Sequence, residues 1–335
     1  MAVTVSVSPY EPSLAAKWDD FVMNKSMNGT FLQTRNFLSY HPEGRFEDAS
    51  LVVWKGSSDV LAVVPAARVA GEGGAEFSSH PGSTFGGLVF SRQFYDIEHV
   101  DAALDRLEAY LAEGGYASAR LKQSSQAFSS RSCDLLNYLL FQHGWTELDE
   151  ISFVIDFADY AEDAPSNFTG SRRRGYRHGV KAGLEFCELS DDASVAAFHA
   201  LLSENLEKFG TQPVHTLEEL LEFKNTRLRD GVRFYGSFHE GRMVAGSMAF
   251  LFENRSVFHT QYLCASQERA DQRLYPSNHL DANLIMEARR LGYRRFSFGV
   301  STEDRGRVLN RSLAEFKEGF GTSYVNNRSF ERSFL

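Results

Sequence analysis

The segment 274–324, LYPSNHLDANLIMEARRLGYRRFSFGVSTEDRGRVLNRSLAEFKEGFGTSY, decides the predicted fold. Pro276 and Ser277 open a predicted helix, and Gly292 ends it. Its apolar residues follow the helical repeat at Leu280, Leu284, Ile285, Ala288 and Leu291. A short strand is predicted at 295–299. A second predicted helix carries Leu309, Leu313, Phe316 and Lys317 and ends at Gly321. Strand-to-helix junctions of this kind place backbone N–H groups around ligands.

The two halves of the chain repeat the same order of predicted elements. The hairpin pattern LVVWKGSSDVLAVVPAARV at 51–69 is matched by FYGSFHEGRMVAGSMAFLF at 234–252. A helix then leads to GGYASARLK in the first half and to LGYRRFSFG in the second. This order predicts a duplicated α/β (α+β) unit, in which each copy is a mixed, mostly antiparallel sheet flanked by helices. An acidic, proline-containing linker at 159–170 places the predicted boundary between domains 1–160 and 161–335.

Composition excludes several classes of protein. The chain has 335 residues, of which 43% are hydrophobic and 24% charged, as in ordinary globular proteins. Its formal net charge of −9 argues against a dedicated nucleic-acid binder. No apolar run approaches the roughly 20 residues of a membrane span, and the start shows no secretory signal. Three widely spaced cysteines, Cys133, Cys187 and Cys264, lack metal-ligand spacing. We therefore expect a cytoplasmic protein without a metal site.

Several motifs in the second half occur in a familiar order. They are Lys181 to Leu184, KFGTQPVH at 208–215, LYP at 274–276, FSFG at 296–299 and FKEGFG at 316–321. Together they resemble the FemAB-like branch of the GNAT acyltransferase superfamily. The resemblance covers residues 165–330 well and the first half through the duplication. It implies two tandem GNAT-like domains and the transfer of an acyl group to an amine.

The resemblance leaves the donor and the acceptor open. FemAB enzymes add an aminoacyl group from tRNA to a peptidoglycan precursor, whereas other relatives use acyl-CoA. The glycine-rich pyrophosphate loop of ordinary GNAT enzymes is replaced here by DQRLYPS at 271–277. The coiled-coil arm of some tRNA-using members is not evident. We therefore expect no permanently bound cofactor, with either acyl-CoA or aminoacyl-tRNA as co-substrate and a small-molecule or peptide amine as acceptor.

Acyl transfer to an amine requires oxyanion stabilisation and a proton for the leaving group. The resemblance implies that Lys317 faces the transferring group or a phosphate; the alternative is a solvated lysine favoured by the helix dipole. Tyr262 and His279 are candidates for proton transfer, although a core tyrosine and a surface histidine would explain them as well. Backbone N–H groups along strand 256–265 are the expected oxyanion donors. Asp281 is interpreted as a dipole-favoured residue of the first helical turn.

One dense basic cluster lies on the predicted helix 172–183. Its apolar residues Tyr176, Val180 and Leu184 predict the packed face, which would leave the basic residues outward. Glycines four residues apart on the same helix indicate close approach of another backbone or of a phosphate. The candidate substrate-binding residues are Arg172, Arg173, Arg177, Lys181, Gln212, Tyr275 and Ser277.

Two other functions remain open at this stage. One is a non-catalytic protein that kept the fold and binds a nucleotide-sugar or a peptide. The other is a nucleic-acid-binding module that uses the basic helix, for which affinity would fall steeply with salt.

Overall fold

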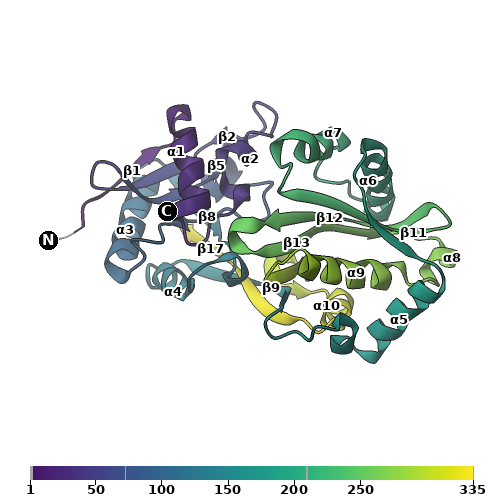
Figure 1. The fold of residues 1–335 in the computed structure, drawn as a ribbon. Coiled ribbons are helices and arrows are strands. Elements are labelled where there is room, and N and C mark those ends of the chain that lie inside the picture. Colours follow the sequence, from purple (N-terminus) through teal and green to yellow (C-terminus); the bar gives the residue numbers. More distant parts are fainter. Residues whose placement is uncertain (1–2, 72, 209, 335) are drawn as a thin grey trace. The chain divides into compact units, whose positions relative to one another are not determined.

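The computed structural model describes residues 3–71, 73–208 and 210–334. The chain folds into two compact units, coloured along the sequence in Figure 1. Unit 1 contains residues 1–151, 304–307 and 325–335, and unit 2 contains residues 152–303 and 308–324. Among the described residues, no helix combines the length and the apolar character that crossing a bilayer would need.

Unit 1 contains two groups of paired strands. The first is a four-stranded antiparallel sheet in the order β1 (Val5–Pro9), β3 (Leu51–Lys55), β4 (Asp59–Val64) and β7 (Val89–Phe90). The second contains β2 (Glu47–Asp48), β5 (Ala66–Gly71), β6 (Gly74–Ser79), β8 (Tyr116–Lys122) and the end of β17 (Ser323–Ser333). The helices are α1 (Ala15–Asp20), α2 (Arg35–Leu38), α3 (Ile97–Glu113) and α4 (Asp134–Gln142).

The second half of the predicted hairpin at 51–69 is two strands. β4 ends at Val64 and pairs with β3, whereas β5 starts at Ala66 and pairs with β6 in the other group. Pro65 lies between them. Because proline has no N–H to donate to a ladder, the chain leaves one sheet at this residue and enters another.

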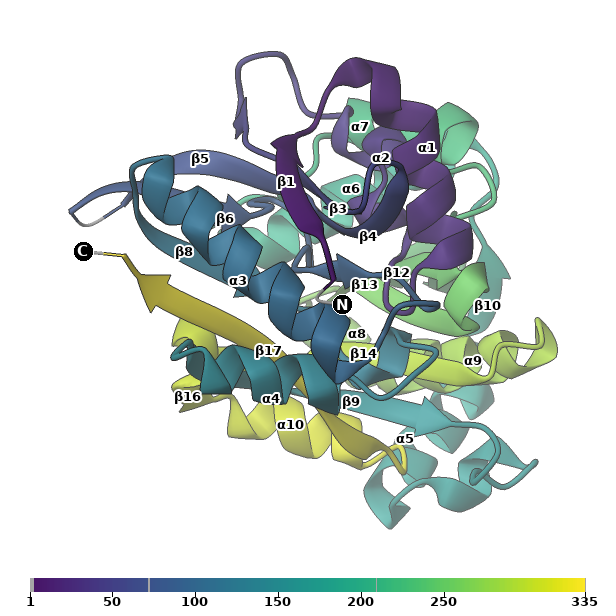
Figure 2. The ribbon, with the colours of Figure 1, turned by 90° about the vertical axis from the view of Figure 1, so that its left-hand side faces the viewer.

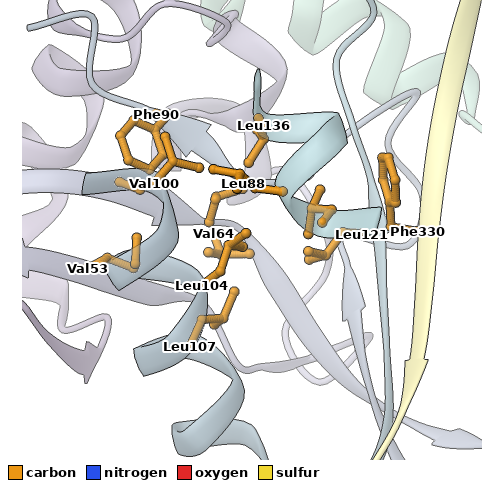
Figure 3. Close-up of a cluster of buried hydrophobic side chains, with 14 of the residues drawn as sticks. Val53, Val64, Leu88, Phe90, Val100, Leu104, Leu107, Leu121, Leu136 and Phe330 are labelled. Atoms are coloured by element: carbon orange, nitrogen blue, oxygen red, sulfur yellow. The ribbon is translucent and has the colours of Figure 1, made fainter. Parts of the chain in front are cut away.

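The core of unit 1 lies beneath α3, which crosses in front of β8 in Figure 2. Asp96 caps the start of this helix, because its side chain accepts a hydrogen bond from the His99 N–H. Its buried residues Val100, Leu104 and Leu107 follow the helical repeat and contact the strands (Figure 3). Phe330 of β17 joins the same core beside Leu121 of β8, which is its antiparallel partner.

Unit 2 is built on the strand order β10 (Glu185–Glu188), β11 (Val232–His239), β12 (Arg242–Phe252), β13 (Val257–Ala265), β14 (Arg295–Val300) and β9 (Thr146–Asp156). All of these pairs are antiparallel except β13 with β14. The helices are α5 (Gly170–Lys181), α6 (Asp192–Glu207), α7 (Leu217–Glu222), α8 (Arg269–Gln272), α9 (Pro276–Arg290) and α10 (Arg311–Glu318), and β15 (Thr302–Glu303) pairs with β16 (Val308–Leu309). Mixed sheets flanked by helices confirm the predicted fold class.

The helix and strand predicted at 276–291 and 295–299 correspond to α9 and β14. Four of the five predicted apolar residues of α9 are buried, and Leu291, just past its end, is exposed. The following helix begins later than predicted, so that Leu309 lies in β16. Asn310 sets this start, because its side chain accepts a hydrogen bond from the Leu313 N–H.

The two halves exchange their last strands. β9 follows α4 of the first half, yet its residues 152–156 pair with β14 in unit 2. β17 follows α10 of the second half, yet its residues 329–333 pair with β8 in unit 1. The division of the chain therefore differs from the predicted boundary at 160/161, since unit 2 includes residues 152–156 of β9 and unit 1 includes residues 325–333 of β17.

Candidate active site

β13 and β14 separate after a short parallel pairing. The pairing joins Val257–His259 to Arg295–Ser297 and ends there, whereas β12 continues to pair with β13 as far as Ala265. Both separating strands are irregular at this point. A register shift on β13 leaves Gln261 as an extra residue, and another shift interrupts β14 between Ser297 and Gly299. Such bulges are frequent beside active sites.

Lys317 is buried next to the point of separation. Its side chain comes from α10 and is only 4% exposed. The Nζ donates to the carbonyl of Val300 at 2.6 Å and to that of Gly299 at 3.2 Å. Burial lowers the pKa of Lys317 to about 8, although the charge of Asp281 acts against this shift. Lys317 is therefore not the solvated lysine of the alternative interpretation. An ammonium has three donors, so one remains for a ligand.

Asp281 is a further functional candidate, and its interpretation as a dipole-favoured residue of the first helical turn is wrong. It is 2% exposed, and its Oδ1 has no hydrogen-bond partner among the described residues, so it is not a surface residue favoured by the helix dipole. Burial raises its pKa to about 7, against the opposing charges of Lys317 and Arg172. One signal was present in the sequence. Asp281 lies three, four and seven residues before the buried Leu284, Ile285 and Ala288, on the apolar face of α9.

Arg172 turns inward from the basic helix α5. Its Nη1 donates to Asn278 Oδ1 at 3.2 Å, and its guanidinium lies 4.3 Å from the centre of the Phe316 ring. Its stem packs on the end of α10, since a Cβ at Gly319 would lie 2.5 Å from Arg172 Cγ. Burial lowers its pKa, and the charge of Asp281 raises it. Arg172 and Lys317 are thus two cations that interact with one buried carboxyl group.

His259 completes this group at the last paired position of β13. Its Nδ1 lies 3.1 Å from Ser297 Oγ, on the facing residue of β14. Burial, together with the charge of Lys317, lowers the pKa of His259 to about 4. The imidazole is therefore neutral at neutral pH. We call Arg172, His259, Asp281 and Lys317 the Asp281 cluster. Periodicity and spacing did not single out His259, because its burial depends on the pairing of two strands.

The glycines of α5 allow it to approach α9, and the two helices lie side by side in Figure 1. A Cβ at Gly175 would lie 2.2 Å from Asn278 Nδ2, and one at Gly179 would lie 3.2 Å from His279 Cβ. The predicted packed face is wrong at Val180, which is 52% exposed. Leu184 is buried and Tyr176 is half-buried, as that face requires. Close approach of another backbone, one of the two explanations offered for the glycines, is what the structure shows. It brings Arg172 to the Asp281 cluster.

Gly175→Ala is expected to destabilise the protein by about 1–3 kcal/mol, because the added methyl group overlaps Asn278. Helix propensity alone would favour alanine by about 1 kcal/mol. Gly170→Ala, at the first position of the same helix, meets only the flexible end of Arg174 and serves as the matched control. Thermal unfolding of both variants measures the difference. A melting temperature for Gly175→Ala at or above that of Gly170→Ala would contradict the close contact.

The proposed proton-transfer residues differ in their surroundings. Tyr262 follows the extra residue of β13, and its hydroxyl lies 2.6 Å from Nδ1 of His215. Burial raises the pKa of Tyr262, which keeps the phenol protonated at neutral pH. His279 is buried, contrary to the surface alternative. Its Nδ1 lies 2.8 Å from Ser237 Oγ and its ring stacks on Tyr176, while burial lowers its pKa to about 4.

The remaining predicted residues do not all gather at the Asp281 cluster. Arg173 donates to the carbonyl oxygens of Phe168 and Ser166 before α5. Tyr275 has a left-handed backbone at the start of α9, and its ring lies against His178. Ser277 follows in the first turn of α9 and is half-buried. The other three predicted residues, Arg177, Lys181 and Gln212, are exposed. Phe209, in the same motif as Gln212, lies outside the described residues.

The segment that replaces the glycine-rich loop forms α8 and the turn before α9. Asp271 holds it in place by accepting from Arg242 Nη2 at 2.6 Å. In the described part of the chain, no group of three or more His, Cys, Asp or Glu side chains is arranged to hold a metal ion. The cations of the Asp281 cluster and of α5 are thus the groups of this region suited to the phosphates of a co-substrate.

Comparison with known proteins identifies this region. Residues 166–317 match the family model described as an acetyltransferase (GNAT) domain. A comparison with curated protein sequences found no match. Among solved structures, FemX is similar with a TM-score of 0.68 and 12% identity, over 98% of this chain and 97% of that chain.

Two further solved structures share the fold. L-PGS from Bacillus licheniformis has a TM-score of 0.59 and 14% identity, over 97% of this chain and 93% of that chain. A tandem GNAT protein from the clavulanic acid biosynthesis pathway has a TM-score of 0.57 and 10% identity, over 99% of each chain. At these identities the likeness shows the fold alone. It confirms the predicted tandem GNAT-like fold.

Proposed function

We propose that this chain, whose residues 166–317 match the family model of an acetyltransferase (GNAT) domain, is an acyltransferase that moves an acyl group from acyl-CoA to the amine of a small molecule or peptide. The Asp281 cluster carries this proposal. It gathers a buried ammonium, a guanidinium and a carboxyl group next to the point where β13 and β14 separate. The cluster lies inside the matched domain and is built on its strands and helices.

The proposed reaction forms an amide and breaks a thioester. The lone pair of a neutral amine attacks the carbonyl carbon, a C–N bond forms, and the C–S bond then breaks. The nitrogen loses a proton, and the thiolate of coenzyme A gains one. Negative charge develops on the carbonyl oxygen between these steps. The protein therefore accelerates the reaction most by placing donors where this charge develops.

We assign the oxyanion-stabilising role to Lys317. Two of its N–H groups are held by the carbonyls of Gly299 and Val300, which fixes the direction of the third. A positively charged donor in a buried site acts more strongly than in water. Backbone N–H groups of β13 near the irregularity at Gln261 are proposed as further donors.

Tyr262 is the proposed acid that protonates the leaving thiolate, because burial keeps its hydroxyl protonated. His279 is instead proposed to position the first turn of α9, since Ser237 and Tyr176 already engage its ring. Arg172, Arg173, Arg177, Lys181, Tyr275 and Ser277 are proposed for the phosphate-bearing co-substrate, and Gln212 for the acceptor.

The test combines ligand binding with turnover at a fixed protein concentration. A ligand at 100 times its dissociation constant adds about 2.7 kcal/mol of stability, which raises the melting temperature by several degrees. Acetyl-CoA, longer acyl-CoAs, coenzyme A, an aminoacyl-tRNA and a UDP-linked muropeptide are compared. Release of free thiol from acyl-CoA in the presence of amines then measures transfer.

A melting-temperature shift with acyl-CoA and amine-dependent thiol release would support the proposal. A shift with aminoacyl-tRNA and the muropeptide, without one for any acyl-CoA, would contradict the donor. It would favour aminoacyl transfer to a peptidoglycan precursor instead. Binding of a nucleotide-sugar or peptide without turnover of any donor would contradict catalysis and favour a binding protein with this fold.

A further inference from the structure

A cavity of about 380 Å³ in unit 1 is lined by basic residues from separate segments. Lys17 comes from α1, Lys25 ends the helical turn that follows α1, Arg92 follows β7, and Arg131 precedes α4. The volume lies within the range of small-molecule sites, which is about 300–1,000 Å³. We call it the Arg92 cavity.

The charge of the Arg92 cavity is opposite to that of the chain. Four cationic side chains line it together with one carboxylate, Asp59, whereas the whole chain carries a net charge of −9. Lys25 pairs with Asp20 at 2.6 Å on the surface. In the described part of the chain, the other three cations, Lys17, Arg92 and Arg131, form no ion pair with any carboxylate. Three uncompensated cations around one cavity therefore favour an anionic ligand.

A larger cavity in the same unit differs from the Arg92 cavity, because its arginines pair with carboxylates. It has a volume of about 1500 Å³ and is also lined by arginines. There, Arg120 and Arg305 both pair with Glu331, at 2.8 Å and 3.2 Å. Arg332 pairs with Glu108 at 2.7 Å. An anion entering that cavity would have to displace these carboxylates, whereas the Arg92 cavity has no such competition for three of its cations.

Two of these cations are held in position by the backbone. Lys17 Nζ donates to the Ser58 carbonyl at 2.8 Å and lies 4.6 Å from the centre of the Trp54 ring. Arg92 Nη2 donates to the Asn24 carbonyl at 3.3 Å. Each contact uses one donor, out of three on the ammonium and five on the guanidinium. The remaining N–H groups are available to a ligand with several acceptor oxygens, such as a phosphate.

The cavity also has an aromatic wall. Phe21 is buried and Phe94 is half-buried, and both line the same space as the cations. Phe94 stacks on His99 and lies 4.4 Å from Lys55 Nζ, and Phe21 packs in the core beneath. The surface that both rings turn toward the cavity can be covered by the organic part of a phosphate ester but not by an inorganic anion. We propose that the Arg92 cavity binds a phosphorylated small molecule whose organic part packs against Phe21 and Phe94. This site lies in unit 1 and does not depend on the acyl transfer proposed for unit 2.

The experiment measures binding of phenyl phosphate and of inorganic phosphate to the full chain by isothermal titration calorimetry. We expect saturable binding at one site, with phenyl phosphate the tighter ligand. Arg92→Met and Arg131→Met should each raise the dissociation constant for phenyl phosphate about tenfold or more. Arg106→Met removes the same charge from an exposed position on α3, outside the cavity, and should change it less than twofold. Thermal unfolding without ligand checks that each variant is folded.

The Lys317→Met variant separates this proposal from the function of unit 2, because it should bind phenyl phosphate like the wild-type protein. Equal weakening by Arg92→Met and Arg106→Met would show non-specific attraction and overturn the proposal. Absence of saturable phenyl phosphate binding to the wild-type protein would overturn it as well. Equal affinity for inorganic and phenyl phosphate would overturn the role of the aromatic wall.

Discussion

Lys317→Met is expected to lower the rate of acyl transfer at least about a hundredfold while the protein remains folded. Loss of one oxyanion donor typically costs about 10²–10³ in turnover. Methionine has a similar length and an apolar end, so it fills the buried space that the lysine leaves. The carbonyls of Gly299 and Val300 lose their donor, which is expected to reduce the stability by about 1–3 kcal/mol.

The measurement is amine-dependent thiol release from acyl-CoA, followed at several substrate concentrations. A fall in kcat with little change in KM would identify a contact made in the transition state. Lys224→Met is the control, because its Nζ pairs with Asp192 on the surface of unit 2. Unchanged kinetics of a folded Lys317→Met variant would refute the proposed role of this residue.

Asp281→Asn is expected to change the pH dependence of stability more than any surface substitution. The carboxyl group of Asp281 has an ordinary pKa of 3.8 when unfolded and about 7 when folded. Between these values the folded state binds more protons than the unfolded state, so Asp281 makes stability fall as pH rises from about 4 to about 7. The loss amounts to at most about 4 kcal/mol, since each unit of pKa difference corresponds to about 1.4 kcal/mol. Asparagine cannot ionise, so the variant lacks this loss.

Lys317 changes the pH dependence of stability in the opposite direction at higher pH. Its pKa falls from 10.5 in the unfolded chain to about 8 in the folded chain. The unfolded state then binds more protons between these values, and stability rises with pH from about 8 to 10.5. Chemical unfolding of the wild-type protein and of Asp281→Asn at pH 4 to 10 measures both effects. A constant difference between the two proteins from pH 4 to pH 7 would contradict the buried carboxyl group.

Local pattern was sufficient for the elements around the site. The helical spacing of Leu280, Leu284 and Ile285 and the ending at Gly292 predicted α9, and a short run of alternating residues predicted β14. These patterns depend on contacts within a few residues, so they can be read directly from the chain. The order of motifs, which ends in FKEGFG, also singles out Lys317 without any knowledge of its burial.

Pairing between distant strands was beyond local pattern. The sequence around residues 152–156 and 329–333 does not predict the strand with which each segment pairs. In the structure, the two segments pair with strands of the opposite halves. The choice follows from which sheet edge each strand reaches in the folded chain. Val180 was misplaced for a related reason, since α5 approaches α9 through Gly175 and Gly179 and leaves Val180 exposed.

The sequence by itself determined the repeated α/β organisation and the main elements of unit 2, and it singled out Lys317 as a candidate site residue. Only the tertiary structure decided that Asp281, His259 and Arg172 surround it. Asp281 and His259 reach the site because α9 packs on the sheet and β13 pairs with β14. Burial then shifts their pKa values, and burial is a property of the whole fold rather than of any short stretch of residues.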